Sequence, residues 1–186
     1  MRRISNEAQM KEFREERALI SVFVHHAYRA GLIEMVLGMR KGFDYHVRQA
    51  WHMMIPYVQG DYAVDAAMHA EEYGGELARR IIEKHGLQHK ELPALIFEFV
   101  PDTEYFCVKL GGKSEDEIEE IIGTIGDMAV DEYKNGPKEV SEFRENIHTR
   151  IAIYLRQRKL LSILSKAAPK MGGILAAAND AKGLFD

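Results

Sequence analysis

The stretch LISVFVHHAYRAGLIEMVLGM, residues 19–39, is the most apolar part of the chain, and the expected fold follows from it. Its apolar residues fall on nearly every side of a helix, which is typical of a helix at the centre of a domain. Because two histidines, an arginine and Glu34 interrupt the stretch, we interpret it as a buried helix and not as a membrane span. The sequence therefore predicts one long central helix over residues 6–40.

Four more helices are expected from apolar periodicity and from start and stop signals. Gly86 directly after His85 is typical of a helix end. Ser114 followed by Glu117 is a capping box, which indicates where the fourth helix begins. Together with the central helix, the expected helices span residues 6–40, 43–58, about 62–85, 114–134 and about 138–166.

Between the third and fourth helices the apolar residues no longer follow the helical spacing of 3.6 residues. Two short runs rich in aromatic and β-branched residues, ALIFEFV and EYFCVKL, are joined by Pro-Asp-Thr and predict a β-hairpin over about residues 94–110. We find no internal repeat and no linker long enough to divide the chain, so residues 1–186 are expected to form a single domain with a flexible or docking tail over about residues 169–186. The predicted fold class is mainly α: a bundle of about five helices with one inserted hairpin, α+β in a strict count.

The charge balance is mildly acidic, with a formal net charge of −4 and a pI near 6.1. This balance argues against nucleic acid as a partner, because phosphate backbones are bound by a basic face. The single cysteine, Cys107, allows no disulfide within the chain, which is typical of a reducing compartment. We therefore expect a cytoplasmic protein with no membrane partner, in which Cys107 is a small core residue.

Two glutamates fall on the apolar faces of predicted helices. Glu34 shares a face of the central helix with apolar residues, and Glu71 lies between Met68 and Ala78 on the third helix, beside two glycines. A carboxylate on a buried face must be hydrogen-bonded, paired, metal-bound or protonated, because burying it bare is too costly. Two inward carboxylates from two apolar helices are one way to build an acid/base pair or a metal site.

Two alternatives stand beside this interpretation. Each glutamate can instead pair with a buried arginine such as Arg158, which lies near the centre of the apolar face of its own helix. On the third helix Asp65, His69 and Glu72 also have the spacing of metal ligands. Their stripe continues with opposite charges three or four residues apart, however, which is typical of a solvated helix face.

Histidines complete the candidate site. His46 lies at the edge of the apolar face of the second helix, and for such a residue the plainer alternative is a satisfied boundary histidine. Glu145 and His148 have the Glu-x-x-His spacing of di-iron bundles, but no second copy of the motif exists, which disfavours such a site. The predicted catalytic residues are Glu34, Glu71 and His46. The predicted metal ligands are Glu34, Glu71 and His25, with a divalent metal ion as the candidate cofactor.

No dinucleotide fingerprint, phosphate loop or nucleophile elbow is present in the sequence. The leading hypothesis is an intracellular enzyme or binding domain for a small molecule, with a pocket between the first three helices that contains the inward carboxylates. The competing hypothesis is a non-catalytic subunit or assembly protein, in which the hairpin and the tail make the contacts and the inner glutamates are structural pairs. Under either hypothesis we expect a homo-oligomer or a subunit of a complex.

Overall fold

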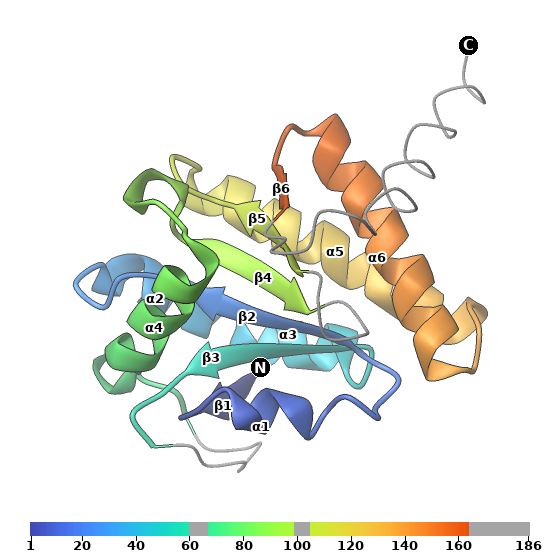
Figure 1. Ribbon diagram of the computed structural model, residues 1–186, viewed down its shortest axis with the longest axis horizontal. Helices are drawn as coiled ribbons and strands as arrows, with labels where there is room; N and C mark the ends of the chain where they lie inside the picture. Colours follow the sequence, from blue (N-terminus) through green and yellow to red (C-terminus); the bar gives the residue numbers. More distant parts are fainter. Residues whose placement is uncertain (60–66, 99–104, 164–186) are drawn as a thin grey trace.

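The computed structural model describes residues 1–59, 67–98 and 105–163, and these residues form an α/β fold (Figure 1). The expected helical bundle with one attached hairpin is therefore wrong, because a β-sheet forms the centre of the molecule. The described residues contain one six-stranded mixed sheet of order β1-β3-β2-β4-β5-β6. Its strands are β1 (Arg2–Ile4), β2 (Leu19–Val24), β3 (Trp51–Pro56), β4 (Ala94–Glu98), β5 (Tyr105–Lys109) and β6 (Leu161–Ile163).

The sheet is mixed because its first three strands are parallel and the others antiparallel. β1 and β2 each run parallel to β3, whereas β4 pairs with β2 in the antiparallel direction. β5 continues antiparallel to β4, and β6 antiparallel to β5. β2 and β3 are thus interior strands, with a neighbour on each side.

The two stretches that the sequence assigned to the first two helices contain these interior strands. All six residues of LISVFV in β2 are buried, as are all six residues of WHMMIP in β3. Helices cover both faces of the sheet, so its interior strands are apolar on both sides and lack the alternation that marks a half-exposed strand. A continuous apolar run of this kind fits a buried helix and a buried strand equally well.

Helices form a layer on each face of the sheet. The apolar side chains of α2, α3, α5 and α6 pack in one core with Leu19 and Phe23 of β2. Ile20, Val22 and Val24 of the same strand point to a second core, formed mainly with α1 and α4. The helices are α1 (Ala8–Lys11), α2 (Ala30–Gly38), α3 (Arg40–Val47), α4 (Gly75–His85), α5 (Glu115–Asn135) and α6 (Val140–Gln157), and the two 3-10 turns are η1 (Ala70–Glu72) and η2 (His89–Glu91).

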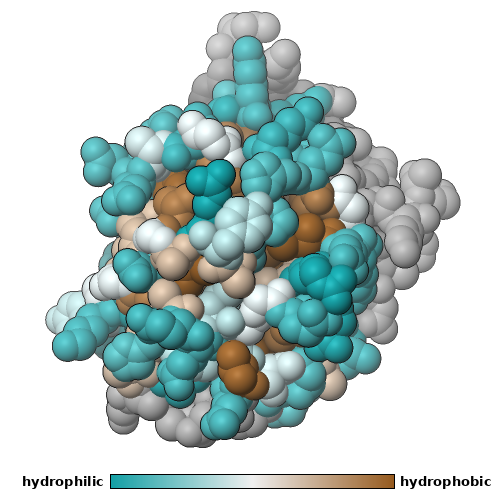
Figure 2. Space-filling model, turned by 90° about the vertical axis from the view of Figure 1, so that its left-hand side faces the viewer, coloured by the Kyte–Doolittle hydropathy of each residue, from teal (hydrophilic) through white to brown (hydrophobic). Residues whose placement is uncertain are grey.

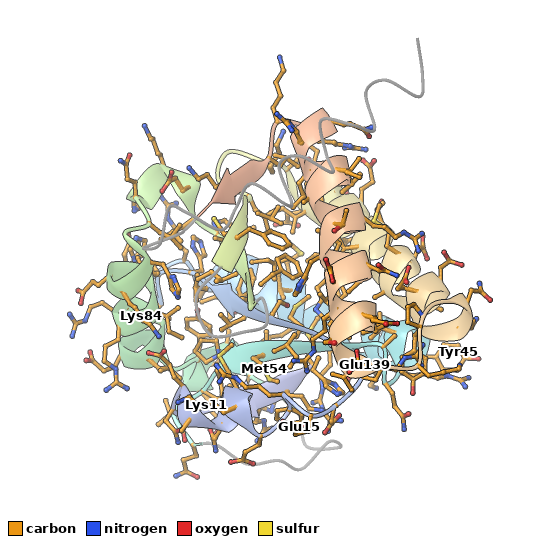
Figure 3. All side chains as sticks on the ribbon, turned by 45° about the vertical axis from the view of Figure 1, so that its right-hand side comes forward. Lys11, Glu15, Tyr45, Met54, Lys84 and Glu139 are labelled. Atoms are coloured by element: carbon orange, nitrogen blue, oxygen red, sulfur yellow. The ribbon has the colours of Figure 1, made fainter. Side chains whose placement is uncertain are left out.

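The second layer is small and is held by side chains at its rim as well as by its core. Lys84 of α4 and Lys11 of α1 are seen on the side of the sheet where Met54 is labelled (Figure 3). Lys84 forms an ion pair with Glu7, the residue before α1. This pair joins the two helices across the face of the sheet that includes Met54.

Several local predictions are confirmed. β4 and β5 pair antiparallel where the hairpin is expected, although the connecting residues 99–104 lie outside the described part of the chain. Ser114 and Glu117 form the capping box at the start of α5, and α4 ends at His85 with Gly86 in the left-handed conformation. Cys107 is a buried residue of β5. The expected flexible or docking tail, about residues 169–186, lies outside the described residues.

The strand order reverses at β2, and this reversal positions a candidate site. From β2 the chain passes through α2 and α3 to β3 on one side, and later returns through α4 to β4 on the other side. Val24 at the end of β2 stands opposite Ala94 at the start of β4. In open α/β sheets, ligands bind outside the carboxyl ends of strands at such a reversal. The loop between Val24 and α2 leaves the sheet at this point.

A close approach of two backbones fixes η2 beside this end of the sheet. A Cβ atom built at Gly111 would overlap the carbonyl oxygen of Lys90 in η2. We expect Gly111→Ala to lower the free energy of unfolding by about 2 kcal/mol, because the backbone must shift to admit the methyl group. Urea unfolding followed by circular dichroism measures this change.

Gly123→Ala is the matched control. Gly123 is an exposed residue of α5, and a Cβ atom there would meet no other atom within 4 Å. Because alanine is the better helix former, this variant should be as stable as the parent or more stable by up to about 1 kcal/mol. Equal losses in the two variants would contradict the close approach at Gly111.

Candidate ligand site at the carboxyl end of β2

The candidate site is formed by the loop His25–Arg29, which joins β2 to α2. His25 is buried and His26 is half-buried, whereas Ala27, Tyr28 and Arg29 are exposed. Apolar side chains reach the surface between hydrophilic ones on the side of the molecule that carries α2 and α4 (Figure 2). The loop thus passes from the core of the sheet to solvent within five residues.

Tyr73 fixes the start of the loop. The Tyr73 hydroxyl accepts a hydrogen bond from the His25 backbone N–H at 2.9 Å and donates one to the His25 carbonyl oxygen at 3.2 Å. Burial raises the pKa of Tyr73 well above its usual value of 10, so this hydroxyl stays protonated and can play both roles. Since both backbone groups of His25 are held, the direction of its side chain is restricted.

The His25 side chain has an unusual environment. Only 4% of the residue is exposed, and neither ring nitrogen has a hydrogen-bond partner among the described residues. Burial, together with the nearby charges of His26, Arg29 and His89, lowers the pKa of His25 from 6.5 to about 4. The ring is therefore neutral at pH 7 and has one N–H donor and one acceptor nitrogen. Buried polar atoms without partners are rare, and each demands an explanation.

Three nearly parallel rings lie at the surface beside His25. The His26 ring is 5.0 Å from that of Tyr28 and 4.9 Å from that of His89 between centroids, at interplanar angles of 12° and 24°. The Tyr28 hydroxyl lies 3.1 Å from Nδ1 of His89. His89 belongs to η2, so this ring layer joins two segments that are far apart in the sequence. Exposed flat rings of this kind offer a stacking surface to a planar ligand.

The loop also carries the positive charge of Arg29. Arg29 lies over the Tyr28 ring at 5.9 Å from its centroid. Burial, followed by the charges of His89 and Arg29, lowers the pKa of His26 below its usual 6.5. The His26 ring is therefore neutral at pH 7, and none of His26, Arg29 and His89 forms an ion pair with another described residue.

The two predicted glutamates are brought together, but at the surface. Glu34 of α2 and Glu71 of η1 line one open hollow of about 280 Å³, and both are exposed. The expectation that they point inward is therefore wrong. The expectation placed both glutamates on buried faces by assuming continuous helices over residues 6–40 and about 62–85. In the structure α2 begins only at Ala30, and Glu71 lies in a 3-10 turn before α4, so neither residue has the helical phase that was assumed. Glu72 is exposed as well and accepts a hydrogen bond from Tyr57 at 2.8 Å.

The predicted histidines lie in separate places. His46 is exposed on α3, with Nε2 2.8 Å from a carboxylate oxygen of Asp127 in α5, whereas His25 is buried beneath the loop after β2. Within the described ranges, no three His, Cys, Asp or Glu side chains lie close enough to hold a metal ion. The structure therefore does not bring Glu34, Glu71 and His25 together as ligands.

The remaining sequence candidates are also placed. Arg158 pairs with Glu120 of α5 and not with either predicted glutamate. Glu145 is exposed on α6, as its helical phase predicts, whereas His148 is fully buried and not marginal. The Glu-x-x-His pair therefore points in two different directions. Asp65, the first residue of the charged stripe, lies outside the described residues.

Sequence reasoning missed Tyr28, Tyr73 and His89. The available signal was the run HHAYR directly after the apolar residues 19–24. Polar and aromatic residues at the carboxyl end of a buried strand are candidates for a binding loop. That signal is visible only when residues 19–24 are assigned to a strand.

Comparison with known protein families, curated proteins and solved structures finds no match to this chain. The fold and the site therefore define only a class: an open, mixed-sheet α/β protein with a histidine-rich loop at the reversal of strand order. A Cys-x-x-Cys pair beside a β-α-β unit indicates thioredoxin-like redox chemistry, and a chain with Cys107 alone cannot carry that pair. In the described parts of the chain, no helix has the length and apolar character needed to cross a membrane.

Proposed function

We propose that this chain binds a small molecule at the loop His25–Arg29, with His25 as its polar contact and the rings of Tyr28, His26 and His89 as its stacking surface. The observation that carries the proposal is the buried, unpaired ring of His25. A ligand that bonds to this ring would supply the missing partner, because a neutral imidazole offers one donor and one acceptor. The neighbouring ring layer is accessible to the rest of such a ligand.

The proposal keeps the function expected from the sequence, binding of a small molecule, but places the binding site at other residues. A pocket with two dry carboxylates has no support, because Glu34 and Glu71 are exposed. A histidine-centred site has support from burial, from the position at the reversal of strand order and from the stacked rings. The expected cytoplasmic location and the expected oligomer or complex stay predictions.

The proposal is tested first by stability. His25→Leu removes two unpaired buried nitrogens while keeping a similar volume, so we expect the free energy of unfolding to rise by about 1 kcal/mol. His52→Leu is the matched control, because His52 is equally buried but bonds to Glu16 through Nε2 at 2.7 Å. That variant should lose about 1–2 kcal/mol, since it removes a hydrogen bond to a charged carboxylate. Urea unfolding of both variants measures the contrast.

Binding is the second part of the test. Benzamide, benzoate and phenyl phosphate are added separately to the full chain labelled for NMR of histidine rings. At least one of them should shift the ring signals of His25, His26 and His89 together, and His25→Leu should remove the effect. If His25→Leu destabilises the chain as His52→Leu does, and no probe moves these signals, His25 is a structural residue and the proposal is wrong.

A further inference from the structure

We propose that the group recognised at this site is a phosphate carried by an aromatic small molecule, bound between the amino end of α2 and the side chains of His25, Arg29 and His89. This inference rests on the proposed function and names its ligand class. Three features of the structure support it: the open helix end, the buried histidine and the unpaired positive charge of Arg29.

The amino end of α2 is open. Its N-cap residue, Arg29, makes no side-chain hydrogen bond to the helix, and the first turn contains no acidic residue. Ala30 and Gly31 are exposed, so the first amides of the helix are not covered by their own side chains. The first N–H groups of a helix lack partners within it and carry the positive end of its dipole, so they favour a bound anion.

The buried histidine is an independent observation in the loop that leads into α2. The His25 ring lies 6.2 Å from the His26 ring between centroids, and both of its nitrogens are enclosed and without partners among the described residues. In contrast, the His52 ring, which is equally buried, bonds to Glu16. A bound oxygen atom would give the His25 N–H an acceptor and remove the cost of leaving it unpaired.

The loop offers an anion one permanent positive charge together with several N–H donors. The positive charge is that of Arg29, which forms no ion pair with a described carboxylate, whereas burial lowers the pKa of His26 and leaves its ring neutral at pH 7.5 with one N–H donor. A phosphate carries between one and two negative charges near neutral pH and three acceptor oxygens, so it can bond to a guanidinium, an imidazole and helix amides at once. A carboxylate has fewer oxygens and less charge to share among these donors.

The aromatic part of the ligand follows from the ring layer. Tyr28 is 69% exposed, and its ring is nearly parallel to that of His26. A flat organic group attached to the phosphate can stack on these rings while the phosphate bonds at the helix end. Phenyl phosphate has both parts in the smallest form and is therefore the probe of choice.

The experiment compares phenyl phosphate, inorganic phosphate, benzoate and benzamide by calorimetric titration of the full chain at pH 7.5 and low salt. We expect phenyl phosphate to bind at least tenfold more tightly than benzoate and benzamide, and inorganic phosphate to compete with it. Arg29→Gln should weaken phenyl phosphate at least tenfold. Lys138→Gln, which removes the same charge from the exposed turn between α5 and α6, should change it less than twofold.

Each outcome decides between the proposals. If benzamide binds as tightly as phenyl phosphate and Arg29→Gln changes neither, the site takes a neutral ligand: the phosphate inference is overturned and the proposed function stands. Equal binding of benzoate and phenyl phosphate means that charge alone is recognised, which also overturns the inference. If no probe binds and His25→Leu is destabilising, both proposals fail together.

Discussion

Arg144→Met is expected to lower the free energy of unfolding by about 3–5 kcal/mol. Arg144 lies on α6 and is only 3% exposed. Its guanidinium donates to the backbone carbonyl oxygens of Phe13 at 2.9 Å, Glu16 at 2.8 Å and Ala18 at 3.3 Å. Methionine can fill most of the space but removes three hydrogen bonds from a charged donor, and the carbonyl oxygens of Phe13 and Glu16 keep only their bonds from backbone N–H groups.

Loss of the Arg144 guanidinium also affects a part of the chain outside α6. The three carbonyl groups belong to the segment between α1 and β2, so Arg144 fixes how the chain enters the central strand. Arg156→Met is the control, because Arg156 is an exposed residue of the same helix and loses the same charge. It should change stability by no more than about 0.5 kcal/mol. Urea unfolding at pH 7 compares the two, and similar losses would mean that the three backbone bonds contribute little.

The local parts of the fold could be predicted from the sequence because their signals are local. The capping box at Ser114 and the apolar stripe Ile118–Ala129 place α5 correctly. The hairpin strands were also found, since their aromatic and β-branched residues are flanked by turn signals. In each case the residues that decide the element lie within a few positions of one another.

The centre of the sheet could not be predicted because its pairing is not local. β2 pairs with β3, about thirty residues later, and with β4, seventy or more residues later. The run LISVFV shows no alternation, because both faces of the sheet are covered. Once this run was assigned to a helix, the phase of everything up to Met39 followed from a period of 3.6 residues, and Glu34 was placed on the wrong face.

The assignment of residues 19–24 to a helix also hid the candidate site. In a helix, neighbouring histidines at 25 and 26 point to different flanks and suggest nothing in particular. At the carboxyl end of a central strand, the same two residues stand where the strand order reverses. His89 adds to them only through tertiary structure, because η2 is brought beside the loop by the close approach of Gly111 to Lys90. No spacing rule connects residues 26 and 89.

Acid should destabilise this protein, and His148→Leu should remove a large part of that sensitivity. Burial in the core, with a smaller effect from the Arg144 charge, lowers the pKa of His148 from 6.5 to about 3. Between these two values the unfolded chain takes up a proton that the folded chain does not. The neutral histidine therefore contributes its full stability above pH 6.5 and loses it as the pH falls toward 3. Between pH 6 and pH 4 this single group accounts for about 2.5 kcal/mol.

Urea unfolding at pH 4, 5, 6 and 7 measures the effect as the slope of stability against pH. The leucine variant should lose about 2.5 kcal/mol less than the parent between pH 6 and pH 4, whatever its stability at pH 7. His69→Leu is the control, because the His69 side chain is exposed and its backbone groups make the contacts with Tyr57. That variant should keep the slope of the parent. Parallel slopes for the parent and His148→Leu would show that the buried ring accepts its proton without unfolding the chain, and that the acid sensitivity arises from other groups.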